Sequence, residues 1–366
     1  MQNFKQLFFF LFFFVILAEL IFGYWFKENP LYLIKTPYKD YKYFKKNIYE
    51  NQQKKVVNKY NIYGMRYDNN NISNLDGIFF GSGIMLQSQI SDGKTFVDLL
   101  ENKKDIKLAN FGADGQSTSG HIHTLELLKK YTILNSKYYI FLLGMNEGSK
   151  NENYKNRTYT TWNFKSNFIN LIIKNSFFFK KIYETQVNLK NLVLNFSHFF
   201  IEKKKVHEIN NEFKEYSNFI NTEITKEKYN YVKNLLIKQN YYTNKNMEKI
   251  FEIVKKEFKS KLIFLTLPNS NFYWKNNELY IYNKTFDFDN ELPLEKKIFY
   301  EFNYLRGKII SDQIMKKCEI LESICINGFD KLKLNPHDFN DQFHLNEIGS
   351  EKVFNFLNLN FKNVSF

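Results

Sequence analysis

Cysteine and arginine are scarce in this sequence of 366 residues. The two cysteines, Cys318 and Cys325, exclude a four-cysteine zinc site and an iron–sulfur cluster held by cysteine alone. They lie seven positions apart, so a disulfide in an oxidising compartment and two buried thiols both stay open. Only three arginines are present, although phosphate and base readers favour the planar fork of arginine. The net charge of +14 therefore does not predict a nucleic-acid partner.

Alanine is equally rare, with three residues, whereas lysine, asparagine, isoleucine, phenylalanine and tyrosine are abundant. This pattern is typical of an AT-rich coding sequence, so the aromatic content of 19% says little about function. The chain is long enough to bury a sizeable core, which excludes a disordered protein and a disulfide miniprotein.

A long apolar run comes first, LFFFLFFFVILAELIFGYWF over residues 7–26. Its 20 residues match the roughly 30 Å hydrocarbon core of a bilayer, and Glu19 is its only charge. A cleaved signal peptide is the first alternative, but no small-x-small cleavage site follows. A buried helix of a soluble domain is the second. We predict a single-pass transmembrane anchor.

The lysines flanking this run give an unclear orientation. Lys5 precedes it, and four lysines follow it closely: Lys27, Lys35, Lys39 and Lys42. Counted literally, the positive-inside rule leaves the main domain in the cytoplasm. Lysine is abundant everywhere in the chain, which dilutes that argument.

After the anchor, short apolar runs alternate with helical patterns, as in β-α-β units around a parallel sheet. Strands are predicted at residues 77–80, 106–111, 138–143 and 262–267, with a short last one opening at Ile324. Helices are predicted from residue 95 and over 119–131, 295–320 and 346–359. We expect an anchor at residues 1–26 and one domain at 27–366. Residues 150–258 contain no glycine or proline and are predicted as a helical insertion or a cover for the sheet.

Small and polar residues follow three of the predicted strands, where a doubly wound sheet places its site. These blocks are Gly81-Ser82-Gly83, then Asn110-Phe-Gly-Ala-Asp-Gly115, then Gly144-Met-Asn146-Glu147. A fourth block, DQFHLNEIG from Asp341 to Gly349, precedes the final helix.

Acyl transfer needs a nucleophile, a base, a group that orients the base, and donors for the oxyanion. Asp341 and His344 lie three residues apart on one loop, so the carboxylate can hold one imidazole nitrogen while the other faces a nucleophile. The Gly115 N–H and the Asn146 amide are candidate oxyanion donors, together with an N–H of the 81–83 turn.

This ordered set resembles the SGNH/GDSL hydrolases, a family of esterases, lipases and carbohydrate acetyl-esterases. The resemblance spans residues 75–150 and 260–358. It implies a three-layer α/β/α sandwich with a parallel, flavodoxin-like sheet. It places Gly115 and Asn146 at the oxyanion positions and Asp341 and His344 at the late pair. No metal or organic cofactor is implied.

The sequence departs from the family pattern at the nucleophile. Gly83 occupies the serine position of the family, and Ser82 lies one residue early. One hypothesis makes Ser82 the nucleophile in a turn whose register has moved by one. A second keeps the fold without hydrolysis. A third uses Ser117, Ser88 or a water activated by His344.

Each site residue also has a purely structural interpretation. Gly112 and Gly115 can serve turn geometry alone, and Asn146 can bridge backbone groups. His344 can be a packed loop histidine, with Asp341 capping the last helix. His121 and His123 are two apart, so they face different directions, which favours packing or surface roles over metal binding.

The sequence thus predicts a membrane-anchored serine hydrolase, an acyl or acetyl esterase whose catalytic residues are Ser82, Asp341 and His344. Its expected partner is an ester-bearing small molecule, glycan or lipid, with the domain outside the cytoplasm and attached through residues 7–26. The alternatives are an inactive binding or scaffold protein and an O-acyltransferase in envelope polysaccharide assembly. The oligomeric state stays open.

Overall fold

The structure is a computed structural model. It describes residues 2–23, 41–46, 53–61, 65–66, 74–131, 136–148, 176, 178, 226–268, 272–275, 278–281, 294–340 and 344–364. The chain divides into two compact units, one of Met1–Pro30 with Thr160–Ile209 and one of Leu31–Tyr159 with Asn210–Phe366. The domain boundary between residues 26 and 27 stays a prediction.

Helix α1 (Gln2–Phe22) belongs to the first unit. Its large apolar side chains are exposed, for example Phe9 at 73%. Glu19 accepts hydrogen bonds from the Ser176 hydroxyl and the Phe178 N–H. Within the described residues, no helix is long and apolar enough to cross a membrane. The transmembrane helix predicted over residues 7–26 is therefore not supported.

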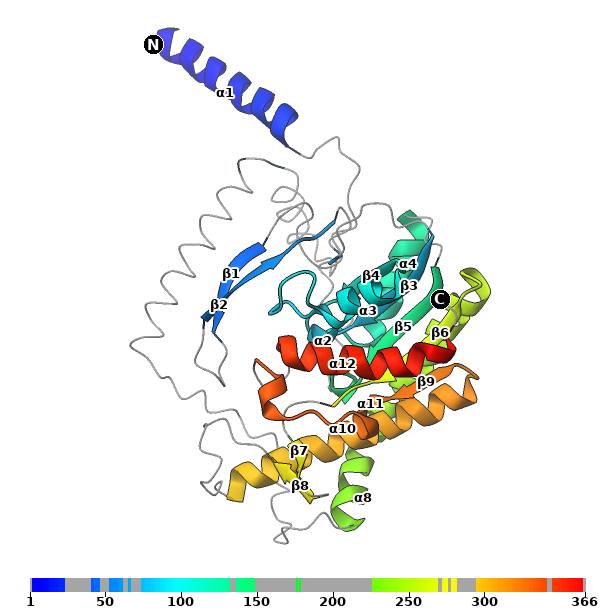
Figure 1. The fold of residues 1–366 in the computed structure, drawn as a ribbon. Coiled ribbons are helices and arrows are strands. Elements are labelled where there is room, and N and C mark those ends of the chain that lie inside the picture. Colours follow the sequence, from blue (N-terminus) through cyan, green and yellow to red (C-terminus); the bar gives the residue numbers. More distant parts are fainter. Residues whose placement is uncertain are drawn as a thin grey trace. The chain divides into compact units, whose positions relative to one another are not determined.

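A parallel sheet forms the centre of the second unit (Figure 1). Its five strands lie in the order β4 (Leu108–Gly112), β3 (Leu75–Gly81), β5 (Ser136–Leu143), β6 (Lys261–Thr266) and β9 (Ile324–Asn327). All four neighbouring pairs are parallel. The chain leaves β3 towards β4 and returns to β5 on the other side. Such a switch point is where doubly wound sheets bind ligands.

Helices cover both faces of this sheet, which confirms the three-layer α/β/α sandwich. Adjacent strand residues alternate between the faces, so Phe80 and Phe79 belong to different apolar clusters. The Phe80 face packs against α4 (Thr118–Tyr131), α8 (Lys226–Leu235), α9 (Ile237–Glu252) and α10 (Leu294–Ile320). The Phe79 face packs against α3 (Phe96–Lys104) and α12 (Glu347–Asn360).

The strands and helices predicted from the apolar runs are confirmed to within a few residues. Helix α3 shows why its start was readable. The Thr95 side chain accepts from the Asp98 N–H, and the Asp98 carboxylate accepts from the Thr95 N–H, which forms a capping box. Helix α12 begins in a similar way, because the side chain of Asn346 accepts from the Gly349 N–H.

Two hairpins were not predicted. One pairs β1 (Tyr41–Lys46) with β2 (Gln53–Asn58), and the other pairs β7 (Phe272–Lys275) with β8 (Glu278–Ile281). The lysines of β1 and β2 hide the apolar alternation that marks a strand. Of the predicted insertion at 150–258, the residues from Lys226 form α8, α9 and a π-helical turn, Ile253–Glu257. Its other residues, Ser176 and Phe178 apart, lie outside the described residues.

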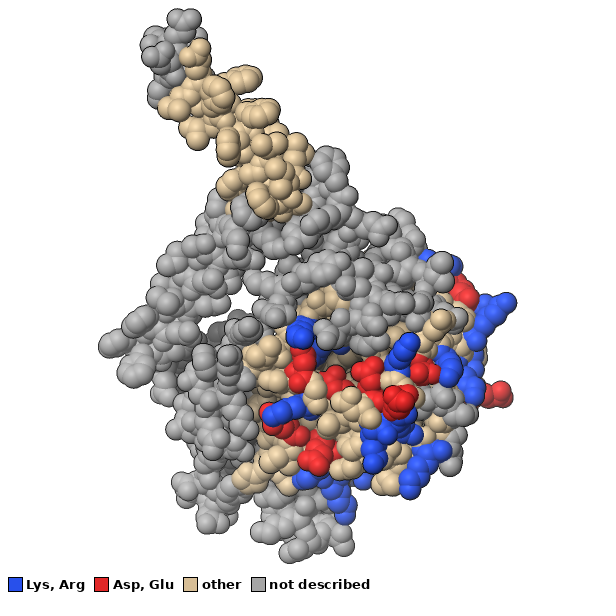
Figure 2. Space-filling model, turned by 45° about the horizontal axis from the view of Figure 1, so that its top comes forward, with Lys and Arg blue, Asp and Glu red and all other residues tan. Residues whose placement is uncertain are grey.

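Charges of both signs are mixed on the face of the second unit shown in Figure 2. In the described part of the chain, several charged side chains pair with one another, for example Lys94 with Glu347 and Lys308 with Asp312 and Asp330. These carboxylates offset the lysine charge locally.

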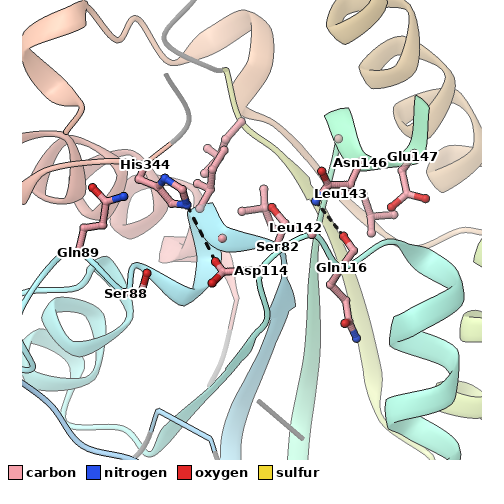
Figure 3. Close-up of a pocket in the computed structure, with 15 residues that line it drawn as sticks. Ser82, Ser88, Gln89, Asp114, Gln116, Leu142, Leu143, Asn146, Glu147 and His344 are labelled. Atoms are coloured by element: carbon pink, nitrogen blue, oxygen red, sulfur yellow. Dashed lines mark hydrogen bonds and ion pairs between the residues drawn. The ribbon is translucent and has the colours of Figure 1, made fainter. Parts of the chain in front are cut away.

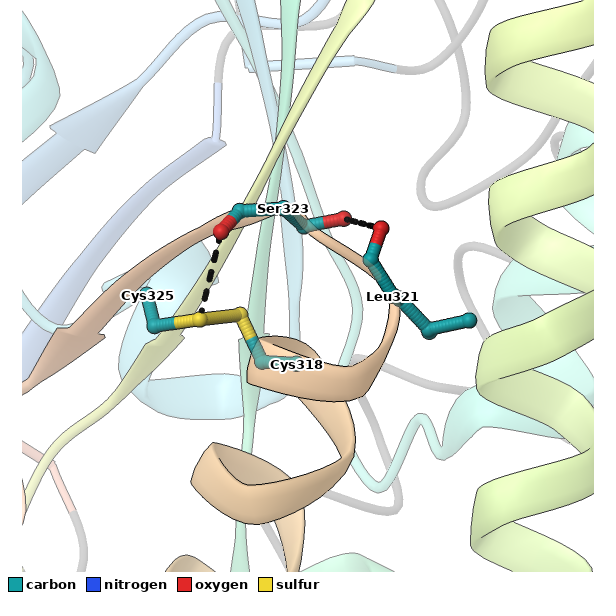
Figure 4. Close-up of a disulfide and its surroundings, with 4 residues drawn as sticks. All are labelled: Cys318, Leu321, Ser323 and Cys325. Carbon is teal, nitrogen blue, oxygen red and sulfur yellow. Dashed lines mark hydrogen bonds between the residues drawn. A yellow bond between two sulfur atoms is a disulfide. The ribbon is translucent and has the colours of Figure 1, made fainter.

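A disulfide joins Cys318 near the end of α10 to Cys325 on β9 (Figure 4). Of the two interpretations that the sequence left open, the structure has the paired one. The bridge spans seven positions and holds the last strand against the helix that precedes it.

We expect loss of this bridge to destabilise the fold. A disulfide that closes a loop of this length lowers the entropy of the unfolded chain and so stabilises the fold by about 2–3 kcal/mol. The Cys318→Ser and Cys325→Ser double variant should therefore unfold at a lower temperature, and a reductant should lower the melting temperature of the wild type but not of the variant. Free thiols alkylated in the unreduced, denatured wild type would contradict the pairing.

Candidate functional site

A cavity of about 420 Å³ opens at the carboxyl ends of the strands, at the switch point between β3 and β5 (Figure 3). The turns that follow β3, β4, β5 and β6 contribute to its lining, and so does His344. It is lined by Ser82, Gly83, Ile84, Ser88, Gln89, Asp114, Gly115, Gln116, Leu142, Leu143, Gly144, Asn146, Glu147, Leu267 and His344. Segments far apart in the sequence therefore meet at one place.

The turn after β3 directs residue 83 towards the histidine. Ser82 is the N-cap of the short helix α2 (Gly83–Leu86). A Cβ added at Gly83 would lie 2.7 Å from the His344 Nε2 atom and 2.8 Å from the Asp114 Oδ1 atom. Real Cβ atoms do not come this close to another heavy atom, so the two groups occupy the space that a side chain at position 83 would need.

Ser82 lines the same cavity, but its side chain makes no capping hydrogen bond. Among the described residues, no hydrogen bond joins Ser82 to His344. A side chain at position 83, where the SGNH/GDSL pattern has its serine, would therefore point at His344, whereas the Ser82 side chain does not bond to it. Ser88 also lines the cavity, whereas Ser117 is not among its lining residues.

The block after β4 fixes the position of this turn. A Cβ at Gly112 would lie 2.2 Å from the backbone nitrogen of Leu86, so only glycine lets α2 approach β4 this closely. The Asn110 side chain donates to the Met85 carbonyl and accepts from the Gly112 N–H. Gly112 and Asn110 therefore clamp α2 onto the sheet.

The expected oxyanion donors, Gly115 and Asn146, both line the cavity. Gly115 has a φ of 71°, the left-handed conformation that favours glycine. Among the described residues, its N–H donates no hydrogen bond. The Asn146 amide donates to the Gln116 carbonyl at 3.0 Å, which ties the turn after β5 to the turn after β4. Both structural and oxyanion roles are compatible with this arrangement.

The loop that carries His344 is braced by its own backbone and by asparagines. The Asn340 N–H donates to the His344 carbonyl, and the Asn340 side chain donates to the Leu345 carbonyl. The Asp338 carboxylate, almost fully buried, pairs with Lys352 of α12. Asp341, the predicted partner of His344, lies outside the described residues.

The imidazole of His344 faces a carboxylate that the sequence analysis did not single out, that of Asp114. The Nε2 atom lies 3.9 Å from the Asp114 Oδ1 atom. A dashed line marks this pair in Figure 3. The Asp114 side chain is 54% exposed and that of His344 is 25% exposed. The only sequence signal was the place of Asp114, directly before Gly115 in the second block.

Arg66 is a buried structural residue that sequence reasoning also missed. All five of its N–H groups donate, to the Asp92 carboxylate, the Asn58 side chain and the carbonyls of Leu86, Gln87 and Ile90. This arrangement fixes the segment from Leu86 to Asp92, which brings Ser88 and Gln89 to the cavity. The rarity of arginine in this chain was the available signal.

We expect Arg66→Lys to lower the free energy of unfolding by about 3 kcal/mol or more. Lysine has three donors in place of five, so at least two charge-assisted hydrogen bonds to buried acceptors are lost. Denaturant unfolding measures the change. The control is Lys94→Met, which removes an exposed ion pair with Glu347 and should cost under about 1 kcal/mol. Equal effects of the two substitutions would contradict this role for Arg66.

Glu147 is a buried carboxyl at the edge of the cavity. It accepts hydrogen bonds from the Thr118 N–H and hydroxyl at the start of α4. Burial raises the pKa of Glu147 to about 7, and the bonds from Thr118 oppose this shift. Asn246 of α9 donates in turn to the Thr118 and Ser119 hydroxyls. Glu147 therefore links the turn that carries Asn146 to two helices.

The raised pKa makes stability depend on pH. The folded chain holds a proton on Glu147 between about pH 4.5 and 7 that the unfolded chain releases, so stability due to this group falls as pH rises through that range. We expect the difference in unfolding free energy between wild type and Glu147→Gln to change by about 3 kcal/mol across it. Glu252→Gln, at an exposed glutamate of α9, controls for the lost charge. A constant difference would refute the assignment.

His121 has the packing role expected for it. Its ring lies edge-on to Phe80 and Phe141, and burial lowers its pKa to about 3, which keeps the imidazole neutral. In the part of the chain that the structure describes, no group of three or more His, Cys, Asp or Glu side chains is placed to hold a metal ion.

Comparison with known proteins gives a likeness of fold. No family model and no curated protein matches the chain. An extracellular lipase from Streptomyces rimosus is 10% identical over 78% of this chain and 99% of its own, with a TM-score of 0.40. A structure from Desulfitobacterium hafniense, assigned to a lipolytic G-D-S-L family, is 8% identical over 79% and 99%, with a TM-score of 0.36. At these sequence identities and TM-scores, the likeness says nothing about the function of this chain.

Proposed function

We propose that this domain is an ester hydrolase of SGNH type that removes acyl or acetyl groups from a glycan or lipid. One observation carries the proposal. A single cavity at the switch point of the sheet is lined by His344, Gly115 and Asn146, the residues that we propose as the base and the two oxyanion donors. The ordered sequence blocks that resemble the SGNH/GDSL hydrolases supply these same residues.

In the proposed reaction, His344 takes the proton of the nucleophile and later returns it to the leaving alcohol. The Gly115 N–H and the Asn146 amide stabilise the negative oxygen of the tetrahedral intermediate. Asp341 orients the imidazole from the same loop, as the sequence pattern predicts. Ser82 is the serine offered by the sequence as nucleophile, and a water at His344 is the alternative.

The lining of the cavity supports a short acyl group attached to a polar alcohol. Leu142, Leu143 and Leu267 give an apolar wall, while Gln89 and Gln116 lie among the polar groups. A volume of about 420 Å³ falls within the range of small-molecule sites.

A location outside the cytoplasm is part of the proposal and is supported by the Cys318–Cys325 disulfide, because such bonds persist in oxidising compartments. Attachment to a membrane through residues 7–26 is a separate proposal that rests on the apolar sequence of that segment. Alkaline carbonate extraction of cells that express the full chain tests it, since an attached protein stays in the pellet.

A second candidate is a binding or scaffold protein without catalysis. It is favoured by Gly83, which has no oxygen to attack a carbonyl at the position that faces His344. An O-acyltransferase, in which a sugar hydroxyl accepts the acyl group, would use the same oxyanion donors.

Turnover of p-nitrophenyl acetate and of an acetylated oligosaccharide by the purified protein tests the proposal. We expect His344→Ala to lower kcat/KM by at least about 10²-fold, since it removes the general base, and Asn146→Ala to lower it by about 10²-fold. His337→Ala, at an exposed histidine on the same loop, is the matched control and should keep wild-type turnover.

The remaining arms separate the candidates. Loss of turnover in Ser82→Ala would make Ser82 the nucleophile. Turnover that survives His344→Ala would contradict the hydrolase proposed here. A wild type that binds acetylated oligosaccharide without cleaving or transferring the acetyl group would favour the second candidate.

A further inference from the structure

The position that faces His344 has no hydroxyl, and two polar groups fill its place. His344 Nε2 and Asp114 Oδ1 both lie within 2.8 Å of where a Cβ at Gly83 would be. A nucleophile must come within about 2.6–3.2 Å of the imidazole nitrogen to transfer its proton. Ser82 belongs to the preceding position of the turn and makes no hydrogen bond with His344 among the described residues.

Asp114 is placed for chemistry more than for structure. It lies in the turn between β4 and α4, directly before the left-handed Gly115. Within the described residues, its carboxylate caps no helix, and the one ionisable side chain that pairs with it is His344 at 3.9 Å. Asp338 in the nearby loop differs in each respect, because it is buried, pairs with Lys352 and accepts from the Asn335 N–H.

We infer that Asp114 and His344 together hold and activate the water that attacks the ester, so that hydrolysis proceeds without an acyl-enzyme. This inference rests on the proposed function and specifies its nucleophile. A water that donates to two acceptors at ~2.8 Å each separates them by roughly 4.4 Å when both hydrogen bonds are linear, and by about 4 Å when they are slightly bent. The separation of 3.9 Å between Nε2 and Oδ1 fits the bent geometry.

The reaction balances with water as the only co-reactant. The water oxygen bonds to the acyl carbon while one of its protons passes to Nε2 of His344. Asp114 accepts the hydrogen bond of the second O–H and thereby orients the attacking lone pair. The carbonyl oxygen becomes the oxyanion beside the Gly115 N–H and the Asn146 amide. When the tetrahedral intermediate collapses, the bond to the alcohol oxygen breaks and that oxygen takes the proton from Nε2. The products are the free acid and the alcohol.

Gly83 has a defined role in this arrangement. A Cβ there would require the ends of the His344 and Asp114 side chains to shift, so the present approach of the two groups depends on glycine. The glycine that removes the serine hydroxyl thus also lets the two acceptors approach the same region of the cavity. With glycine in place of serine at position 83, the nucleophile in this proposal is a water molecule and not a side chain.

The decisive variant is Asp114→Asn, which keeps the shape of the side chain and removes its charge. We expect kcat for p-nitrophenyl acetate to fall by about 10²–10⁴-fold, the range of general acid–base contributions, with KM changed by less than about threefold. Asp105→Asn is the matched control, because Asp105 is an exposed C-cap with a φ of 52° that asparagine also adopts. It should keep wild-type kcat. Thermal unfolding of both variants verifies that each one folds.

Labelling with a fluorophosphonate, which reacts with activated serines, tests the absence of an acyl-enzyme. The wild type should hydrolyse the ester and stay unlabelled, and Gly83→Ser, which places a hydroxyl beside His344, should become labelled. Labelling of wild-type Ser82, or wild-type kcat in Asp114→Asn, would overturn the inference and leave the hydrolase standing. A wild type that hydrolyses no ester would overturn the proposed function and the inference together.

Discussion

The approach of helix α2 to strand β4 is the contact on which the site depends. It is possible only because Gly112 has no side chain, since a Cβ there would overlap the backbone of Leu86. The Asn110 side chain then bonds to both elements and holds them together. With α2 fixed, the turn before it can point in only one direction, and residue 83 is brought to His344. The positions of the candidate catalytic residues thus depend on Gly112 and Asn110, which hold α2 against β4.

Much of the fold could be predicted because its strands are short runs of buried residues and its helices start at recognisable caps. Phe79 and Phe80 in β3 and the Thr95 cap of α3 are examples, since each signal is local in the sequence. The arrangement around Arg66 was not predicted, because its acceptors come from segments up to 26 positions away and are mostly backbone carbonyls. Asp114 was not predicted as a functional residue for the same reason, because it pairs with His344, which lies 230 positions later in the sequence.

The site combines groups with opposite demands on solvent. Glu147 lies at its buried edge, where desolvation favours the protonated acid. Asp114 lies at its open edge with more than half of its side chain exposed. The Glu147 carboxyl therefore links the turn that carries Asn146 to α4. The Asp114 carboxylate stays accessible to solvent. One cavity can hold both a structural carboxyl and an accessible one because its wall is buried at Glu147 and exposed at Asp114.

The Cys318–Cys325 bridge also bears on how the sheet ends. Among the described strands, β9 is the outermost on its side of the sheet and has only four residues, so it presents few unpaired backbone groups. The disulfide to α10 keeps β9 paired with the longer strand β6, whose edge would otherwise be exposed. At the opposite margin, Arg66 forms an isolated bridge with Asn110 of β4 and occupies part of that edge. Both margins of the sheet are thereby made poor templates for a strand from another chain, which protects the protein against edge-to-edge aggregation.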